Sequence, residues 1–160
     1  HTFSHPHLTS LENNGLQHTL AKVNRVFIHN QLNKTDSIFY SNFNIHLKPY
    51  WRAPFGELNK DILSWAAELG YRHIHWSAGC DTWDWVSDKN SSIYRTPEEM
   101  YQHFMKLESA GILHGSIILM HLGTDRKSDY PFSMLPKLFN SLSKKGYKFL
   151  TISQLLRINL

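Results

Sequence analysis

The chain lacks the features that would assign it to several classes of protein. Its single cysteine, Cys80, excludes an internal disulfide and does not indicate a redox compartment. No apolar run reaches the roughly 18 residues that a membrane-spanning helix needs. Internal repeats and low-complexity tracts are absent as well. Charged residues make up 19% of the chain and hydrophobic residues 41%, a balance that predicts a globular protein.

Two functional classes are disfavoured by what is missing. The net charge is +4, but the basic residues are scattered and form no stripe or known motif, so nucleic-acid binding is not expected. His1 and His5 lie four residues apart, yet no glutamate follows His1, and Pro6 opposes the helix that a zinc protease of the H-E-x-x-H type requires.

Hydrophobic periodicity predicts strands that alternate with helices. A helix is expected over 16–32, where apolar residues recur at near-helical spacing, and a polar surface loop over 33–44. The other expected elements are strands over 45–51, 73–78, 116–121 and 148–153, a long loop over 80–95, and helices over 59–69, from Thr96 onward and over 132–145, with a short last helix capped by Ser153. The 160 residues fit one domain, and the alternation predicts an α/β fold with a parallel sheet.

Two of the expected helices carry capping residues. Asn59 is a candidate N-cap for the helix that ends before Gly70. Thr96 is followed by Pro97 in the first turn and by Glu99 three residues on, which is the pattern of a capping box.

Polar residues follow several of the expected strands. Arg52, the 79–85 loop and His121 come directly after strands, and in parallel α/β folds ligands bind at the carboxyl ends of strands. The spacing of His1 and His5 allows two imidazoles to reach one metal ion from a tight loop, and this loop could join the same edge.

Each candidate residue also has an ordinary structural explanation. A histidine pair can arise by chance in a chain with eleven histidines. The remaining alternatives are a surface ion pair for Arg52, a simple turn at 54–56, a turn cap at Asp81, core packing for Trp85 and Leu119, and a satisfied buried imidazole for His121. Four further histidines without motif context are assigned to structure or surface: His7, His73, His75 and His114.

Five segments in order carry a family resemblance: HTFSH (1–5), RAPFG (52–56), DTWDW (81–85), LMH (119–121) and the closing KKGYKFLTISQLL. Together they resemble the polysaccharide deacetylase family, the NodB-homology domain of carbohydrate esterase family 4. The resemblance covers nearly the whole chain. It implies an α/β fold, an incomplete and distorted (β/α) barrel with parallel strands and outer helices.

The resemblance implies a metal site and one wall of a substrate groove. His1 and His5 would be metal ligands, with Thr2 bracing their loop. Arg52 would orient the catalytic base, and the backbone N–H of Phe55 would help to form an oxyanion hole.

The resemblance also implies the opposite wall. Trp85 would line the groove, and Leu119 would shape the pocket for the acetyl group. His121 would be the general acid, oriented by Asp81.

The activity implied is hydrolysis of acetyl groups from N-acetylated or O-acetylated sugars of a polysaccharide, outside the cell or in its envelope. The cofactor would be a divalent metal, zinc before cobalt or nickel, because a metal lowers the pKa of bound water, the nucleophile, and polarises the carbonyl. Histidine is the natural proton donor near neutral pH for the departing amine.

The chain departs from the family at its first motif. The T-F-D-D motif, which supplies the catalytic base and a third metal ligand, has no match, because Asp36, Asp61 and Asp88 lie in other contexts. Leu122 also replaces an acidic residue that many relatives have. We expect the missing strands to lie upstream of His1 or on a separate chain. Otherwise, we expect a second copy of this chain to cover the exposed edge that their absence leaves. The alternative is a carbohydrate-binding or structural relic of the fold. Without the base and the third ligand, the 160 residues by themselves are not expected to be active.

Overall fold

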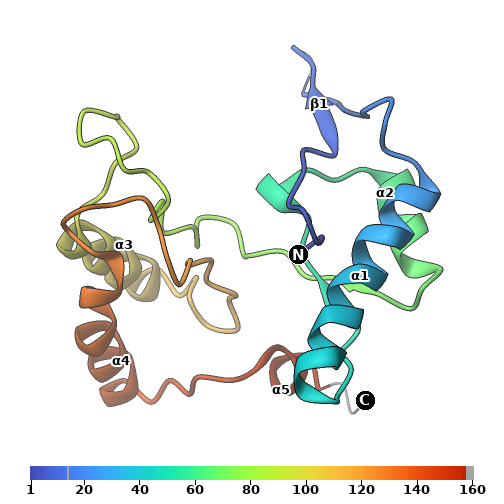
Figure 1. Cartoon of the computed structure of the whole chain (residues 1–160). Coiled ribbons are helices and arrows are strands. Elements are labelled where there is room, and N and C mark those ends of the chain that lie inside the picture. The colour runs from blue at the N-terminus through green and yellow to red at the C-terminus, as the bar shows by residue number, and fades with distance from the viewer. Residues whose placement is uncertain (14, 158–160) are drawn as a thin grey trace. The chain divides into compact units, whose positions relative to one another are not determined.

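The computed structural model describes residues 1–13 and 15–157. The described residues fall into two compact units, one that ends at His75 and one that begins at Trp76. Figure 1 labels the main elements. Each unit has a hydrophobic core of its own. The expectation of one domain over residues 1–160 stays a prediction.

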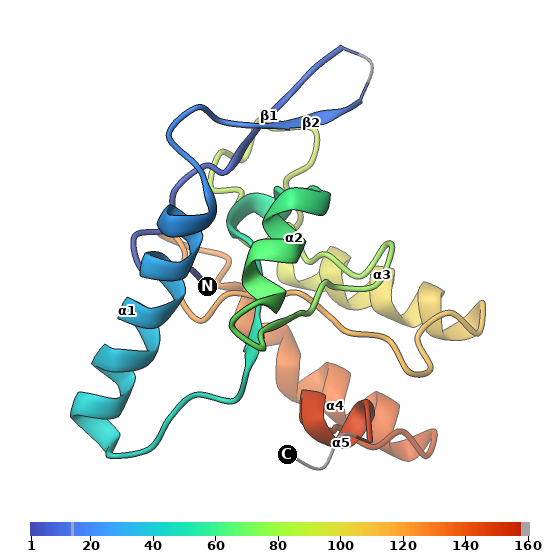
Figure 2. The ribbon, with the colours of Figure 1, turned by 90° about the vertical axis from the view of Figure 1, so that its right-hand side faces the viewer.

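The first unit contains two short sheets. β1 (Thr9–Leu11) and β2 (Gln17–Thr19) pair antiparallel in a hairpin that the sequence reasoning did not anticipate (Figure 2). β3 (Tyr50–Trp51) and β4 (Arg72–His73) pair in parallel, which confirms the predicted orientation. The strand predicted over 45–51 shortens to β3, and the strand predicted over 73–78 is reduced to its first residue, His73, because β4 begins one residue earlier, at Arg72.

The long helix α1 (Arg25–Phe43) corrects two predictions. It begins at Asn24, whose side chain accepts the N–H of Phe27 at 2.9 Å, and it ends at Asn44 in the left-handed conformation. The helix predicted over 16–32 is therefore wrong at its start, where β2 lies, and the loop predicted over 33–44 is wrong because the helix continues. Only Ile28 and Leu32 are buried on it, so its second half shows no apolar period.

The caps predicted at Asn59 and Thr96 are confirmed. α2 (Lys60–Ala67) starts after Asn59, whose side chain accepts the N–H of Ile62 at 3.1 Å. α3 (Pro97–Ser109) opens with the complete capping box of Thr96 and Glu99. These local bonds satisfy N–H groups that the first helical turn leaves without partners.

Helices also dominate the second unit. The 3-10 helix η2 (Pro131–Met134) runs into α4 (Leu135–Lys144), which confirms the helix predicted over 132–145. Gly146 follows at φ +87°, a conformation that glycine adopts without strain. In the described part of the chain, no helix combines the length and the apolarity needed to cross a membrane. The core of this unit consists of Cys80, Met100, Phe104, Leu113, Met134, Leu138 and Leu142.

Residues 77–82 and 117–119 run side by side in parallel. Ser77 N–H donates to Ile117 O at 2.9 Å, and Leu119 N–H donates to Cys80 O at 2.9 Å. These bonds form a single β-bridge, Asp81–Leu119, rather than the strand predicted over 116–121. The predicted parallel direction is nevertheless present here.

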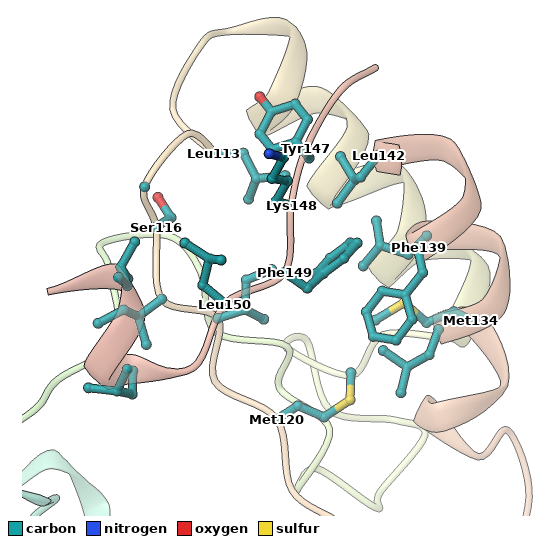
Figure 3. A pocket seen from close by; sticks show the side chains of 17 residues that line it. Leu113, Ser116, Met120, Met134, Phe139, Leu142, Tyr147, Lys148, Phe149 and Leu150 are labelled. Atoms are coloured by element: carbon teal, nitrogen blue, oxygen red, sulfur yellow. The ribbon is translucent and has the colours of Figure 1, made fainter. Parts of the chain in front are cut away.

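The strand predicted over 148–153 is absent from the described residues. Lys148, Phe149 and Leu150 instead line an apolar cavity of about 380 Å³ together with residues 115–118 and α4. The rings of Phe139 and Phe149 meet there with centroids 4.5 Å apart (Figure 3). α5 (Ile152–Leu155) follows, and its cap is Thr151 rather than the predicted Ser153, which lies inside the helix.

Candidate functional site

The first unit brings His1 and His5 together. Their ring centroids are 4.9 Å apart, with the ring planes at 73°. His5 has a φ of +50°, and its N–H lies 3.4 Å from the carbonyl oxygen of Thr2, so the loop turns tightly between the two histidines. A left-handed histidine beside a proline is uncommon, and such conformations persist where the surroundings hold them in place.

The ring of His1 has a defined tautomer. Its Nδ1 lies 2.8 Å from the carbonyl oxygen of Arg52, which can only accept, so Nδ1 carries the hydrogen. The lone pair of a neutral His1 is then on Nε2, the atom available to a metal ion. Such hydrogen bonds commonly orient metal-binding histidines.

Helix α1 fastens this loop. Gln31 Oε1 accepts from the N–H of Ser4 at 2.9 Å and from its hydroxyl at 3.2 Å. One turn further on, the hydroxyl of Thr35 is 3.3 Å from the carbonyl oxygen of His1. Sequence reasoning missed both residues. The cap at Asn24 and the absence of Gly and Pro from 25–43 were the available signals for a continuous helix here.

Thr2 is buried, but among the described residues its hydroxyl has no hydrogen-bond partner. The structure therefore does not show the side-chain bracing that we expected of it. Its contribution to the loop is the carbonyl that faces the N–H of His5.

The R-A-P-F-G segment forms a strained turn, η1 (Pro54–Gly56). Phe55 has φ +57° and ψ 5°, and 57% of the residue is exposed. Its ring packs edge-on against His5 with centroids 4.9 Å apart. The Phe55 N–H makes no hydrogen bond to another described residue. The contribution of this N–H to an oxyanion hole stays a prediction.

Arg52 is half-buried, and its Nε donates to the carbonyl oxygen of Ile74 at 3.2 Å. Burial lowers the pKa of its guanidinium. The expected role of Arg52 in orienting a catalytic base stays a prediction.

His73 supports the same turn from β4. Its Nε2 accepts the N–H of Ala53 at 3.2 Å, a bond that only an unprotonated Nε2 can accept. Burial, followed by the positive charges of His75 and Arg52, lowers the pKa of His73 to about 4. Its neutral form therefore belongs to the folded protein.

This pKa predicts that acid destabilises the fold through His73. The unfolded chain takes up the proton near the ordinary pKa of about 6.5, whereas the folded chain resists until about 4, so stability falls as the pH drops between these values. Unfolding free energies measured across this range should show a smaller decline in His73→Gln than in wild type. His18→Gln, on the exposed hairpin, should retain the wild-type decline. Equal declines in wild type and His73→Gln would contradict the assignment.

The His1–His5 loop offers fewer ligands than a catalytic metal ion normally has in a protein. The imidazoles of His1 and His5 suit zinc, but catalytic zinc normally has three protein ligands. Within residues 1–13 and 15–157, no group of three or more His, Cys, Asp or Glu side chains is placed to hold a metal. The histidine pair therefore fits two ligands of such a site and leaves the third unassigned.

The second unit contains a histidine–carboxylate pair. Asp84 is fully buried, and its Oδ1 lies 2.8 Å from Nδ1 of His121, while its Oδ2 accepts the backbone N–H of His121 at 2.5 Å. The His121 side chain is 39% exposed. The carboxylate thus fixes the tautomer with hydrogen on Nδ1, and Nε2 is the atom left to exchange a proton with a ligand.

The predicted partner of His121 was wrong. Asp81 Oδ1 instead accepts the N–H of Trp83 at 2.7 Å and caps its own turn, the alternative that the sequence left open. The bridge between Asp81 and Leu119 explains the difference. It fixes the backbone at the start of the D-x-x-D sequence, and the second aspartate, Asp84, is then the one that reaches His121.

The two predicted substrate residues of this unit differ in exposure. Trp85 is 52% exposed, so it is not the core aromatic that composition would favour. Leu119 is 7% exposed, and its carbonyl oxygen accepts from the N–H and the hydroxyl of Thr82. Core packing accounts for Leu119, and its role in an acetyl pocket stays a prediction.

Arg126 was missed in the sequence. It is 4% exposed and donates to the carbonyl oxygens of Asp84 at 3.0 Å, Trp83 at 3.1 Å and Arg95 at 2.7 Å. Its guanidinium also lies 4.2 Å from the ring centroid of Tyr94. This buried cation holds the backbone that presents Asp84 to His121.

We expect Arg126→Ala to destabilise the protein by about 3 kcal/mol, because it leaves several buried carbonyl groups without donors. Chemical denaturation measures this loss. Arg25→Ala removes an exposed arginine paired with Glu68 and should cost less than about 1 kcal/mol. Similar losses for the two variants would show that the Arg126 hydrogen bonds add little.

Known proteins support the predicted family. The family model described as polysaccharide deacetylase matches residues 1–74. A peptidoglycan-N-acetylglucosamine deacetylase of Bacillus cereus is 33% identical over 107 residues, covering 67% of this chain and 45% of the relative. A crystal structure of a peptidoglycan N-acetylglucosamine deacetylase superposes with a TM-score of 0.71 and 27% identity over 97% of this chain and 60% of that one. The chain belongs to the polysaccharide deacetylase family.

Other members of the polysaccharide deacetylase family differ in activity. A peptidoglycan-N-acetylmuramic acid deacetylase of Bacillus subtilis is 26% identical over 98% of this chain and 49% of its own length. A pseudoenzyme of carbohydrate esterase family 4 from Bacillus anthracis shares the fold, with a TM-score of 0.70 and 22% identity over 98% of this chain and 44% of that one. The predicted NodB-type fold is confirmed. The chain spans about half the length of the curated relatives it matches.

Proposed function

We propose that this polysaccharide deacetylase domain serves the hydrolysis of acetyl groups from N-acetylated sugars of peptidoglycan. The observation that carries the proposal is the buried Asp84 carboxylate bonded to Nδ1 of His121. This arrangement leaves Nε2 of His121 to protonate a leaving amine. The substrate class follows from the relatives, several of which are peptidoglycan deacetylases.

We further propose that His1 and His5 are two ligands of a divalent cation, zinc before cobalt or nickel. When bound, such a cation lowers the pKa of water and polarises the acetyl carbonyl. The third ligand and the catalytic base would be the aspartates of a T-F-D-D segment outside these 160 residues, supplied upstream or by a separate chain.

The chain's own residues perform the remaining steps. The free N–H of Phe55 donates to the oxygen that gains negative charge as water adds to the carbonyl, and losing such a donor typically costs about a hundredfold or more in rate. The C–N bond then breaks, the acetyl group leaves as acetate, and the imidazolium form of His121 transfers the proton on Nε2 to the departing nitrogen, which leaves a neutral imidazole with its hydrogen on Nδ1 toward Asp84.

Acetate release tests this function with the protein as its gene encodes it. We expect release from purified peptidoglycan and from N-acetylglucosamine oligomers, at a higher rate than from acetylated xylan. Release from xylan alone would contradict the substrate class. No release from any of these polymers by the zinc-loaded protein would contradict the activity.

A catalytically incomplete, carbohydrate-binding relic is the second candidate. It is favoured by one observation, that no group of three or more His, Cys, Asp or Glu side chains among the described residues is placed to hold a metal ion. Sedimentation with insoluble peptidoglycan, without any acetate release, would support this alternative against the first.

A further inference from the structure

The carboxylate of Glu57 connects two segments: residues 7–9, which follow the His1–His5 loop, and the end of the R-A-P-F-G turn. Glu57 comes directly after Gly56, and its Oε2 accepts the N–H groups of Leu8 at 2.7 Å and Thr9 at 3.1 Å. Its Oε1 lies 2.5 Å from Nδ1 of His7. Burial alone would raise the pKa of Glu57, but the bonds from these three neighbours outweigh it and lower the pKa.

His7 carries this connection to the turn. Its ring stacks on Phe55 with centroids 4.1 Å apart and planes at 14°. Phe55 also meets His5 edge-on. The Phe55 ring therefore lies against both His5 and His7, and of these two histidines only His7 is bonded to Glu57.

Hydrogen bonds therefore connect residues 1–9 to residues 52–57 at both ends of these two segments. The His1–Arg52 bond joins them before the turn, and the Glu57 bonds join them after it. Between these points lie His5 and Phe55, both with positive φ. Non-glycine residues hold such conformations where the surrounding structure fixes them.

We infer that Glu57, acting with His7, is a positioning residue that holds the histidine pair and the Phe55 N–H in fixed register. The inference rests on the proposed function, in which the histidine pair binds a cation. It concerns two residues outside the family-like motifs, His7 and Glu57. The carboxylate binds the N–H groups of Leu8 and Thr9 and Nδ1 of His7, so its effect passes through the backbone at Leu8 and the ring of His7.

Zinc affinity tests the inference without relying on turnover. Competition with a chromophoric chelator should show binding about tenfold weaker for Glu57→Gln than for the natural gene product, the lower end of the loss when outer partners of metal ligands are removed. An amide keeps the size of the side chain but offers one accepting oxygen instead of two.

Glu12→Gln is the matched control. Glu12 also pairs with a histidine, His18, at 3.3 Å, but this pair lies on the hairpin. Zinc affinity should not change in this variant. His7→Phe retains a ring to stack on Phe55, loses the bond to Glu57 and keeps the Leu8 and Thr9 bonds, so its affinity should fall less than that of Glu57→Gln.

The possible results separate the two proposals. Folded Glu57→Gln that binds zinc as tightly as wild type overturns the positioning role. If Glu57→Gln does not fold, unchanged affinity in His7→Phe overturns the role instead. A wild-type protein that binds no zinc overturns the proposed function and this inference with it.

Discussion

Asp84→Asn is expected to reduce acetate release by at least about a hundredfold, the lower end of what a general acid contributes. The amide oxygen can accept only one of the two N–H groups that Asp84 now binds at His121, and the amide nitrogen then faces the other donor. Nδ1 of His121 loses its acceptor or its hydrogen, so the proton is no longer held ready on Nε2. Steady-state assays on peptidoglycan measure the effect in kcat.

Asp81→Asn is the matched control for this prediction. Its side chain caps the turn at Trp83 and makes no bond to His121 among the described residues. The amide oxygen can still accept that N–H, so we expect activity within about threefold of wild type, since such a neutral hydrogen bond contributes about 1 kcal/mol or less. A larger loss for Asp81→Asn than for Asp84→Asn would reinstate the original prediction and contradict the observed pairing.

His1→Ala and His5→Ala are each expected to abolish zinc binding and acetate release together. Each removes one of the two imidazoles that lie within 4.9 Å of one another, and a single remaining imidazole is a poor site for zinc. Elemental analysis of the purified variants measures the bound metal.

The same substitution at exposed histidines outside the loop provides the control. His18→Ala and His46→Ala remove imidazoles that pair with Glu12 and Asp36, and both variants should retain zinc. Zinc that survives both His1→Ala and His5→Ala would show that the ligands lie elsewhere. His121→Ala should keep the metal and lose turnover.

Local features of the sequence predicted some elements well. The caps at Asn59 and Thr96 are bonds between residues three apart, so the sequence alone determines them. The second half of α1 buries almost nothing, so periodicity could not reveal it. The strands failed for a different reason, because pairing such as Asp81–Leu119 depends on residues far apart in the chain.

The candidate site divides in the same way. The pairing of His1 with His5 follows from their spacing, and the structure confirms that they lie together. The choice of Asp84 over Asp81 could not be made from a sequence that offers both. Arg126 and Glu57 act over tens of residues through carbonyl oxygens and N–H groups, and such bonds leave no pattern in the chain.

Chelation and readdition of zinc test the proposed chemistry most directly. Acetate release from peptidoglycan by the natural gene product should stop when a chelator removes the metal and should return when about one equivalent of zinc is restored. Acetate release that continues unchanged in the metal-free protein would contradict the proposed metal-dependent hydrolysis.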